Sequence, residues 1–246
     1  MFGWRARIAL VLPADNTVIE PELYALGIPG VSFHGLRLTT DDPVAMRAQA
    51  TDLVAAIEEM AADVVVYGCA ETSFNGGSGT PERLSELMAA GCTAPVVTAT
   101  GAMVAAVRHL GLSHVTVVSP YAPASGALLE SSLAERGIAT AASHHHDFSV
   151  ASADPRTWYD TNRQESWVSY RMARAADVPD SEGVLISATN FRTMETIQVL
   201  EDELGKPVVT SNQAILWRCL DVLGRSVAIP GYGGLLREGR RVGALA

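Results

Sequence analysis

Short apolar runs rich in valine and isoleucine alternate along the chain with longer segments in which apolar residues recur every three or four positions. Helical periodicity marks segments 43–61, 80–91 and 125–137, and the runs that predict buried strands are 7–12, 63–68, 94–99, 114–119, 183–188, 206–211 and 226–231. The helical stretches VRHLG and AERG close on Gly111 and Gly137, as helix ends often do. Strands of this apolar density, with helices between them, predict an α/β fold whose parallel sheets are covered on both faces.

A repeat links the two halves of the chain. The stretch PVVTATGAMVAAVRHLGLSHVTVVSPY (95–121) parallels PVVTSNQAILWRCLDVLGRSVAIPGY (207–232): each has Pro-Val-Val-Thr, a small or polar turn, a helix ending in Leu-Gly, and a strand that closes on Pro with a Tyr nearby. Any two β–α units look somewhat alike, but the shared order of features favours a true repeat. We predict two pseudo-symmetric, doubly wound lobes, residues 1–113 and 114–225, whose strand carboxyl ends face each other across a ligand-binding cleft. The C-terminal segment 226–246 is a candidate to return to the first lobe.

The composition is that of a well-packed globular protein. Of the 246 residues, 48% are hydrophobic and 18% are charged, and the formal net charge is −9. An acidic surface does not attract nucleic acid or an anionic membrane, so neither partner is expected.

The start of the chain and its cysteine content favour the cytoplasm. The apolar run in MFGWRARIALVLP is short and no small-residue cleavage site follows it, so we interpret it as a buried strand and not as a signal peptide. No apolar run reaches the roughly 18 residues that span a bilayer. The three cysteines are odd in number and lack C-x-x-C spacing, which argues against a disulfide framework or a structural zinc site.

Cys69 is the first candidate for chemistry. It lies in VVVYGCAETSFNGG (64–77), directly after an apolar strand, so the residues around it are expected in the loop at the carboxyl end of that strand. Backbone N–H groups in such a loop can hold an anion and lower the pKa of a thiol. The alternative is a small buried hydrophobic side chain, and position alone does not decide between the two. For Cys92 and Cys219 the buried role is favoured.

Neutral hydrogen-bond donors follow several predicted strands. Asn16, in PADNTVIEPE (13–22), can donate its amide hydrogens to a carboxylate, although a turn or helix-capping role suits the same position. Tyr121 offers a phenolic donor or is simply a half-buried tyrosine. Further donors at strand ends are Thr189, Asn190, Ser211 and Asn212. With few obvious cations among them, such a lining suits one or two carboxylates held by neutral groups and backbone amides.

Other motifs give weaker signals. The adjacent histidines His144–His146 cannot all face one site in regular structure, so no metal site is expected there. The glycine-rich stretches GGSG (76–79) and GYGG (231–234) match neither the phosphate-loop nor the dinucleotide pattern. The polar and aromatic segment 154–167 is a candidate to flank or cover the cleft.

Together these residues resemble the aspartate/glutamate racemase superfamily, and most closely its maleate cis–trans isomerase and arylmalonate decarboxylase branch. The resemblance runs through almost the whole chain, in LPADNTVIEPE, VVYGCAETSFNGGSGT, VVTATGA, VTVVSPY, DSEGVLISATNFRTMETIQVLEDELGKPVVTSNQA and IPGYGGLL. It implies two pseudo-symmetric α/β lobes, no cofactor, and one cysteine from each lobe on opposite sides of the substrate. It also implies a homodimer or homotetramer.

The resemblance assigns roles to individual positions. Cys69 matches the cysteine of the first lobe, and Asn16 and Tyr121 match contacts to the substrate carboxylates. The cysteine of the second lobe falls on Ala188, in GVLISATNFRT (183–193). Three explanations of Ala188 stay open: an engineered replacement of a cysteine, which we favour, a natural one-thiol enzyme such as a decarboxylase that protonates one face, or a protein that only binds its ligand.

The expected function is that of a cofactor-independent isomerase, similar to maleate cis–trans isomerase, that acts on a small carboxylate or dicarboxylate through the Cys69 thiolate and is impaired by Ala188. The alternatives are a malonate-type decarboxylase, an amino-acid racemase and a non-catalytic carboxylate-binding protein. Ala70 and Glu71 align with the hydroxyl-bearing loop of the decarboxylases and, with Thr189 and Asn190, are candidate substrate contacts. An inward-pointing Glu71 would repel a dianionic enediolate, which argues against arylmalonate and leaves room for a substrate with an amine or a single carboxylate.

Overall fold

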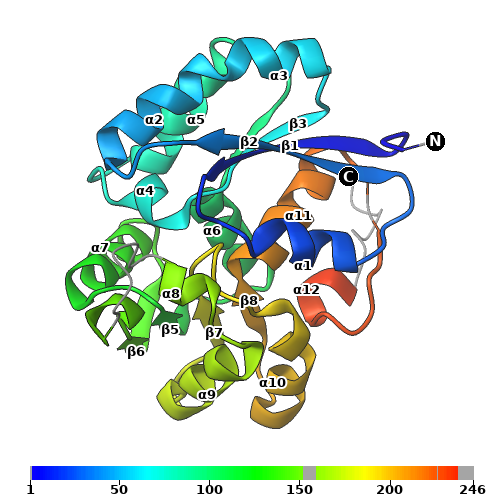
Figure 1. The fold of residues 1–246 in the computed structure, drawn as a ribbon. Coiled ribbons are helices and arrows are strands. Elements are labelled where there is room, and N and C mark those ends of the chain that lie inside the picture. Colours follow the sequence, from blue (N-terminus) through cyan, green and yellow to red (C-terminus); the bar gives the residue numbers. More distant parts are fainter. Residues whose placement is uncertain (1, 152–158, 226, 238–246) are drawn as a thin grey trace.

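The computed structural model describes residues 2–151, 159–225 and 227–237, and contains two parallel sheets of four strands each (Figure 1). The first sheet has the strand order β2-β1-β3-β4 and the second the order β6-β5-β7-β8. The strands are β1 (Ala6–Pro13), β2 (Val31–Leu38), β3 (Val64–Tyr67), β4 (Val96–Thr98), β5 (His114–Ser119), β6 (Ala139–His145), β7 (Gly183–Ile186) and β8 (Val208–Thr210). All neighbouring strands in these sheets are parallel, so the predicted α/β fold is confirmed.

Helices connect these strands and cover the sheets. They are α1 (Ile19–Ala25), α2 (Pro43–Asp52), α3 (Val54–Met60), α4 (Ala70–Phe74), α5 (Thr80–Ala89), α6 (Ala99–His109), α7 (Pro123–Ala134), α8 (Tyr159–Asn162), α9 (Ser166–Ala176), α10 (Ile197–Leu204), α11 (Ser211–Val222) and α12 (Gly234–Arg237), with 3-10 turns η1 (Phe148–Ala151) and η2 (Met194–Thr196). None of the helices in the described ranges has the length and apolar character needed to cross a membrane.

The helical segment predicted over 43–61 forms two helices, not one. α2 and α3 meet at Leu53, which ends one helix and begins the next. Just before this junction the Thr51 hydroxyl donates to the Ala48 carbonyl oxygen (2.6 Å), a local bond that competes with regular helix geometry and often bends a helix. The predicted helices over 80–91 and 125–137 are confirmed as α5 and α7.

Side-chain alternation along the strands assigns the two faces of the first sheet to different helices. On β1, Ile8 and Leu10 belong to a core that contains residues of α1, α6 and α11, whereas Ala9 and Val11 belong to a second core with α2, α3 and α5. Successive side chains of a strand point to opposite faces, which explains the split. The first sheet is therefore covered on both faces (Figure 1).

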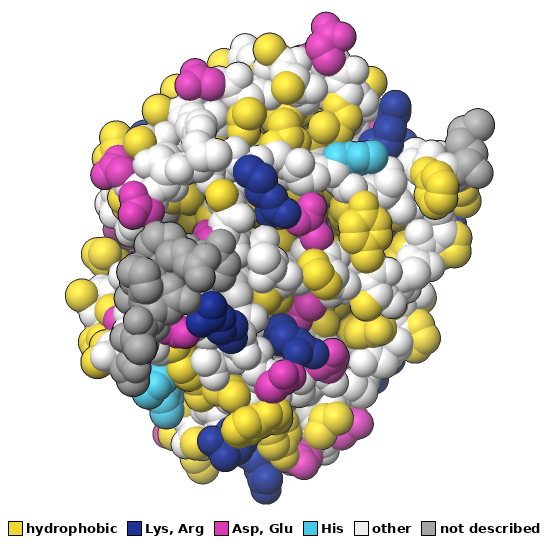
Figure 2. All heavy atoms as spheres, in the orientation of Figure 1, with side chains coloured by type: hydrophobic (Ala, Val, Ile, Leu, Met, Phe, Trp, Pro, Cys, Tyr) yellow, Lys and Arg dark blue, Asp and Glu magenta, His cyan; other side chains and the backbone are white. Residues whose placement is uncertain are grey.

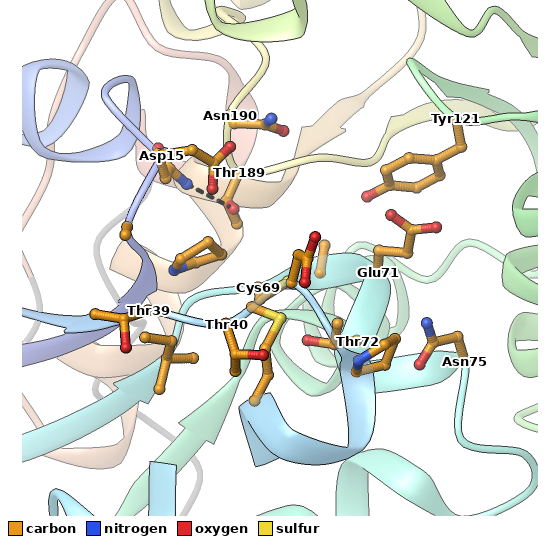
Figure 3. Close-up of a pocket in the computed structure, with 18 residues that line it drawn as sticks. Asp15, Thr39, Thr40, Cys69, Glu71, Thr72, Asn75, Tyr121, Thr189 and Asn190 are labelled. Carbon is orange, nitrogen blue, oxygen red and sulfur yellow. Dashed lines mark hydrogen bonds between the residues drawn. The ribbon is translucent and has the colours of Figure 1, made fainter. Parts of the chain in front are cut away.

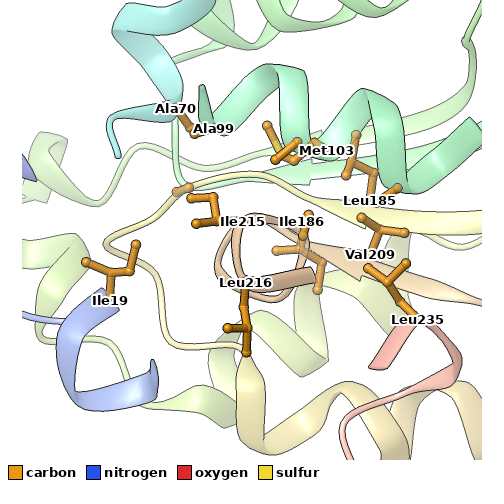
Figure 4. Close-up of a cluster of buried hydrophobic side chains, with 14 of the residues drawn as sticks. Ile19, Ala70, Ala99, Met103, Leu185, Ile186, Val209, Ile215, Leu216 and Leu235 are labelled. Carbon is orange, nitrogen blue, oxygen red and sulfur yellow. The ribbon is translucent and has the colours of Figure 1, made fainter. Parts of the chain in front are cut away.

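The two sheets share one hydrophobic core through α6 and α11. These helices follow β4 and β8, pack against each other, and each also contacts a strand of the other sheet. Met103 of α6 lies near Leu185 of β7 and Val209 of β8, and α1, α4 and α12 add Ile19, Ala70 and Leu235 to the same cluster (Figure 4). The sheets cannot move apart without exposing this surface to water.

Two strands escaped the sequence analysis. β2 and β6 are the first strands in the order of their sheets, where each has a single neighbour, β1 or β5. Edge strands are only partly buried and do not need a continuous apolar run. His34 and Arg37 interrupt the apolar residues of β2, and β6 contains His144 and His145, which explains the weak signal. β4 and β8, the edge strands at the other ends of the two sheets, are apolar because they pack against α6 and α11.

The strand predicted at 226–231 is wrong for the described residues 227–231, which form no strand. The order of the sheets gives the reason. β5, which follows α6, occupies the same place in the second sheet as β1 does in the first. A strand after α11 would repeat that place, but the start of the chain already fills it with β1. Instead, the Ile229 N–H donates to the Leu236 carbonyl oxygen (2.7 Å), and Tyr232 accepts a hydrogen bond from Gln213 of α11 (2.8 Å).

The shared core makes a testable prediction about stability. Leu185 is 0% exposed between β5 and β8, and Leu185→Ala should lower the free energy of unfolding by about 2–5 kcal/mol because it leaves a cavity. Chemical denaturation should still show one cooperative transition, since the core is common to both sheets. Leu128→Ala, at a position 46% exposed on α7, is the matched control and should cost less than about 1 kcal/mol. Separate transitions, or equal losses in the two variants, would contradict the shared core.

Candidate active site

A pocket of about 560 Å³ opens where the carboxyl ends of strands from both sheets meet (Figure 3). The first sheet contributes the residues that follow β1, β2 and β3, and the second contributes residues that follow β5 and β7. This is where parallel α/β folds bind ligands. The predicted site residues that line the pocket are Asn16, Cys69, Ala70, Glu71, Tyr121, Thr189 and Asn190.

Cys69 is half-buried and lies directly before a short helix, where a loop was expected. Its backbone is extended (φ −119°, ψ 108°), and α4 begins at the next residue. The preceding Gly68 allows this approach, because a Cβ there would lie 2.4 Å from Leu12 Cδ2. The Ser73 hydroxyl donates to the Ala70 carbonyl oxygen (2.7 Å) and stabilises the single turn. Figure 3 shows Cys69 in the middle of the pocket residues.

The pKa of the Cys69 thiol is raised, opposite to the lowering that the sequence suggested. Burial is the main cause and, with the negative charges of Glu71 and Asp15, brings this pKa to about 11. Hydrogen bonds from the side chain and backbone of Thr72 act in the other direction but do not compensate. At neutral pH the resting side chain is therefore a thiol, with about one part in ten thousand as thiolate.

A hydrogen-bonded chain joins the two sheets beside Cys69. Thr189, which follows β7, donates from Oγ1 to the Gly68 carbonyl oxygen (2.8 Å) and accepts from Asn16 Nδ2 (3.0 Å). The Asn16 Oδ1 atom accepts from the N–H groups of Val18 and Ile19 (3.0 and 3.2 Å). Asn16 thus stabilises the start of α1, which is the capping role considered for it from the sequence. Its side-chain amide also donates a hydrogen bond across the seam between the two sheets.

Position 188 lies next to Cys69 across this seam. Gly68 precedes Cys69 and Thr189 follows Ala188, so their hydrogen bond brings the two backbone positions together. Ala188 is only 2% exposed, does not line the pocket, and donates its N–H to Ser211 Oγ (3.0 Å). The neighbouring Ser187 Oγ lies 3.3 Å from the Tyr121 hydroxyl. Burial raises the pKa of Tyr121, which keeps the phenol protonated.

Carboxylates also line the pocket. Glu71, on α4, accepts a hydrogen bond at Oε1 from Ser125 of α7 (2.5 Å), so it bridges the halves of the molecule. Asp15 accepts from Asn162 Nδ2 (3.4 Å), and burial raises its pKa. Asn162 belongs to segment 154–167, which was expected to flank the cleft; residues 154–158 lie outside the described residues. Glu71 therefore lines the pocket, as the argument against arylmalonate required.

Glu22, a half-buried carboxylate that no sequence pattern singled out, ties the first half of the chain to the second. Its Oε1 accepts from the N–H groups of Thr193 and Met194 (2.6 and 3.0 Å), and its Oε2 accepts from Asn212 Nδ2 (2.7 Å). Asn212 also donates to the Thr189 carbonyl oxygen (3.0 Å), which connects Glu22 to the pocket. A usable signal existed: on α1 the carboxylate of Glu22 lies one turn from the buried Ile19, on the face that enters the core.

The remaining candidates lie outside the pocket. His145 is held by Ser119 (Nδ1 to Oγ, 2.7 Å) and Glu130 (Nε2 to Oε1, 2.8 Å), and the His146 ring packs on Phe148 at 4.6 Å. Among the described residues no group of three metal-ligating side chains gathers. Cys219 is fully buried, and Cys92 is half-buried with its thiol directed at the Met88 and Ala94 carbonyl oxygens (3.4 Å each).

Comparison with known proteins identifies relatives along the full chain. The family model described as arylmalonate decarboxylase matches residues 8–236. A maleate isomerase of Nocardia farcinica is 29% identical over 97% of this chain and 98% of its own length, and an arylmalonate decarboxylase of Bordetella bronchiseptica is 27% identical over 93% and 92%. In solved structures, a cysteine-to-serine mutant of the N. farcinica maleate cis-trans isomerase, with a covalently bound succinylcysteine intermediate, has a TM-score of 0.84 at 28% identity, covering 94% of this chain and 98% of that one.

The raised pKa of Cys69 predicts its reactivity. Alkylation by iodoacetamide should be slow at neutral pH and accelerate up to a midpoint near pH 11. Thr72→Val removes one of the bonds that favour the thiolate and should slow alkylation at fixed pH by about tenfold, one pKa unit, whereas Thr72→Ser should restore it. Mass spectrometry would follow Cys69, with Cys92 as the internal control. A midpoint for Cys69 at or below that of a free thiol would contradict this assignment.

Glu22 predicts a pH dependence of stability. Burial raises its pKa above the ordinary 4.5, so its contribution to the free energy of unfolding is fully present below 4.5 and is lost as the pH rises through the raised native pKa. Relative to Glu22→Gln, which does not titrate, the parent chain should lose stability as the pH increases through this window. Urea denaturation at a series of pH values measures the difference, with the exposed Glu59→Gln as control. A difference that stays constant with pH would refute it.

Proposed function

The chain belongs to the arylmalonate decarboxylase family, and from that premise we propose that it is a cofactor-independent isomerase that acts on a small carboxylate through the thiolate of Cys69. The observation that carries the proposal is the place of this thiol. Cys69 lines the pocket at the seam of the two sheets, beside the backbone of position 188. Maleate isomerases among the relatives, including one with a succinylcysteine intermediate, support an isomerase that works through a cysteine.

The reference reaction is the conversion of a cis alkene to its trans isomer. The thiolate adds to one alkene carbon, the π electrons move onto the neighbouring carbon and its carboxylate, and the former double bond becomes a single bond that rotates. Elimination of the thiolate then restores the alkene in the trans form. A proton that enters at the neighbouring carbon gives a succinyl-type thioether, and it must leave again before elimination.

The pocket residues supply the groups that this sequence of steps needs. The second amide hydrogen of Asn16 and the phenol of Tyr121 donate to a substrate carboxylate and stabilise the enolate that forms on addition. Thr189, Asn190 and the backbone of Ala70 complete the contacts around it. Because the resting Cys69 is a thiol, a base must take its proton. Asp15 is the candidate base. Its negative charge is close enough to raise the pKa of Cys69, and burial makes its own carboxylate more basic.

Ala188 interrupts the proton transfer on the other side of the substrate. An alanine methyl group neither donates nor accepts a proton, so the adduct, once formed, is protonated and released only slowly. We therefore expect the present chain to be impaired and to accumulate a covalent adduct at Cys69. The cysteine-to-serine mutant from Nocardia farcinica, which carries such an intermediate, supports this expectation.

A malonate-type decarboxylase is the second candidate. The matching family model and the single pocket thiol favour it, because protonation of one face needs one acid. Glu71 in the pocket opposes it, since a dianionic enediolate would be repelled. An amino-acid racemase and a non-catalytic carboxylate-binding protein are the remaining alternatives, and the Ala188→Cys variant below discriminates between the isomerase and the decarboxylase.

Organisation and location form part of the proposal. We place the lobes at residues 1–113 and 114–225, on either side of the junction between α6 and β5, and expect a homo-oligomer, as the family resemblance implies. Cys69, Cys92 and Cys219 are free thiols, which supports the cytoplasm. The net charge of −9 opposes a nucleic-acid partner, and on the face drawn in Figure 2 the coloured Lys and Arg side chains lie among Asp and Glu residues.

The function is tested by restoring the second thiol. Ala188→Cys should raise the rate of fumarate formation from maleate by about 100-fold or more over the parent chain, because a general acid–base pair is completed. Carbon dioxide release from an arylmalonate is followed in parallel. Carbon dioxide without fumarate would select the decarboxylase. Formation of neither product by the variant would reject maleate and arylmalonate as substrates.

The parent chain provides the control for the thiol itself. Incubation with maleate should increase its mass by one maleic acid, located on Cys69 by peptide mapping. Cys69→Ser should show no such increase and should abolish fumarate formation in the Ala188→Cys background. Modification of Cys92 at the same rate would remove the reason to assign the chemistry to Cys69.

A further inference from the structure

The charges around the pocket do not match a dicarboxylate. Among the described residues that line it, three carry carboxyl groups, Asp15, Asp41 and Glu71, and none is Lys, Arg or His. A substrate with two carboxylates would meet these groups in a partly buried space, where like charges repel each other more strongly than in water. A dicarboxylate substrate therefore does not explain why the pocket is lined with negative charge.

Two arginines near the pocket bind protein groups. Arg37 pairs with Glu20 and donates to the Asn16 carbonyl oxygen (3.1 Å). Arg47 donates to the Thr72 carbonyl oxygen and to Asn75 Oδ1 (3.0 Å each). Neither side chain lines the pocket, so neither offsets the carboxylates from within it.

Glu71 is the carboxylate that the fold holds in place. Ser125 of α7 fixes its Oε1 atom from the opposite half of the molecule (2.5 Å), and its Oε2 atom makes no hydrogen bond to another described residue. The negative charge of Glu71 contributes to the raised pKa values of both Cys69 and Tyr121. Figure 3 shows its carboxylate beside the Tyr121 ring. A substrate bound over Cys69 thus has an oriented acceptor with one open oxygen at one end.

The other end of the pocket offers a donor. Thr189 lies on the opposite side of Cys69 from Glu71 (Figure 3), and Asn16 Nδ2, which bonds to the Thr189 hydroxyl, keeps a second hydrogen that suits a single carboxylate. Asp15 lies at this end too, and burial raises its pKa, which favours the neutral acid there. From this polarity we propose that the substrate carries one carboxylate and one cationic group, an ammonium or amidinium, and that Glu71 selects it by pairing with the cation. The inference rests on the proposed function of this pocket and names the substrate class of that site.

A matched set of ligands tests the charge preference apart from the chemistry. Maleate, cis-4-aminobut-2-enoate and cis-but-2-enoate are all cis alkenes with one carboxylate in common. At the other end of the alkene, maleate carries a second carboxylate and cis-4-aminobut-2-enoate carries an aminomethyl group. The third ligand, cis-but-2-enoate, has neither charged group there. Calorimetric binding to the Cys69→Ser chain, which cannot form an adduct, should give an affinity for the amino ligand at least tenfold higher than for maleate. In Glu71→Gln or Glu71→Ser, built on the same background, this ratio should fall by about tenfold or more. Glu59→Gln removes an exposed charge elsewhere and should leave the ratio unchanged.

Each result has a definite meaning. Maleate binding as tightly as the amino ligand, equal effects of Glu71→Gln on all three ligands, or binding of none of them would overturn the inference. Loss of the preference in both Glu71 variants, with cis-but-2-enoate affinity retained, would support it and exclude general damage to the pocket. Because binding is measured without Cys69, the preference can hold even where Ala188→Cys produces no isomer, so failure of the proposed function is recognised separately.

Discussion

One constraint shapes the molecule: two parallel sheets of four strands must each bury one apolar face in a common core built around α6 and α11. Each of these helices begins where β4 or β8 ends, so their packing against each other brings the carboxyl ends of both sheets to one seam. At those ends the backbone leaves the sheet and its polar groups become free to bind other partners. The pocket at the seam follows from the way the core is shared.

Polar contacts across the seam then determine what the pocket can do. Thr189 bonds to Gly68 and Asn16 in buried surroundings, and Glu22 bonds to Asn212 and to the N–H groups of Thr193 and Met194 in partly buried ones. Buried hydrogen bonds lock geometry because breaking one leaves an unsatisfied group away from water. The same burial keeps Cys69 protonated at rest. A thiol in this state resists alkylation and oxidation until a substrate and a base are present together.

On the proposed assignment of the site, two departures from the pattern of the resembling family act in a consistent direction. Ala188 would remove a proton carrier on one side of the substrate, and Glu71 lines the pocket where the resemblance aligns the hydroxyl-bearing loop of the decarboxylases. Both changes would disfavour a dianion, since it would meet repulsion as it enters and find no acid when charge develops on carbon. A monocarboxylate with a cation would meet only the loss of the second thiol. The pocket as proposed therefore favours a narrower substrate class and leaves Cys69 to do the chemistry.

The α/β class, six of the eight strands in the described residues, and the positions of Asn16, Cys69, Tyr121 and Thr189 at strand ends could be predicted from the sequence, because those six strands are short apolar runs and polar residues after them stand out. β2 and β6 contain polar residues among their apolar ones and form no such run, and no local pattern shows that β1 already occupies the place predicted for a strand at 226–231. The protonation of Cys69 and the roles of Glu22 and Ser125 became visible in the tertiary structure. Those properties depend on burial and on partners more than fifty positions away in the chain, as with Ser125 and Glu71, and no local pattern encodes such distances.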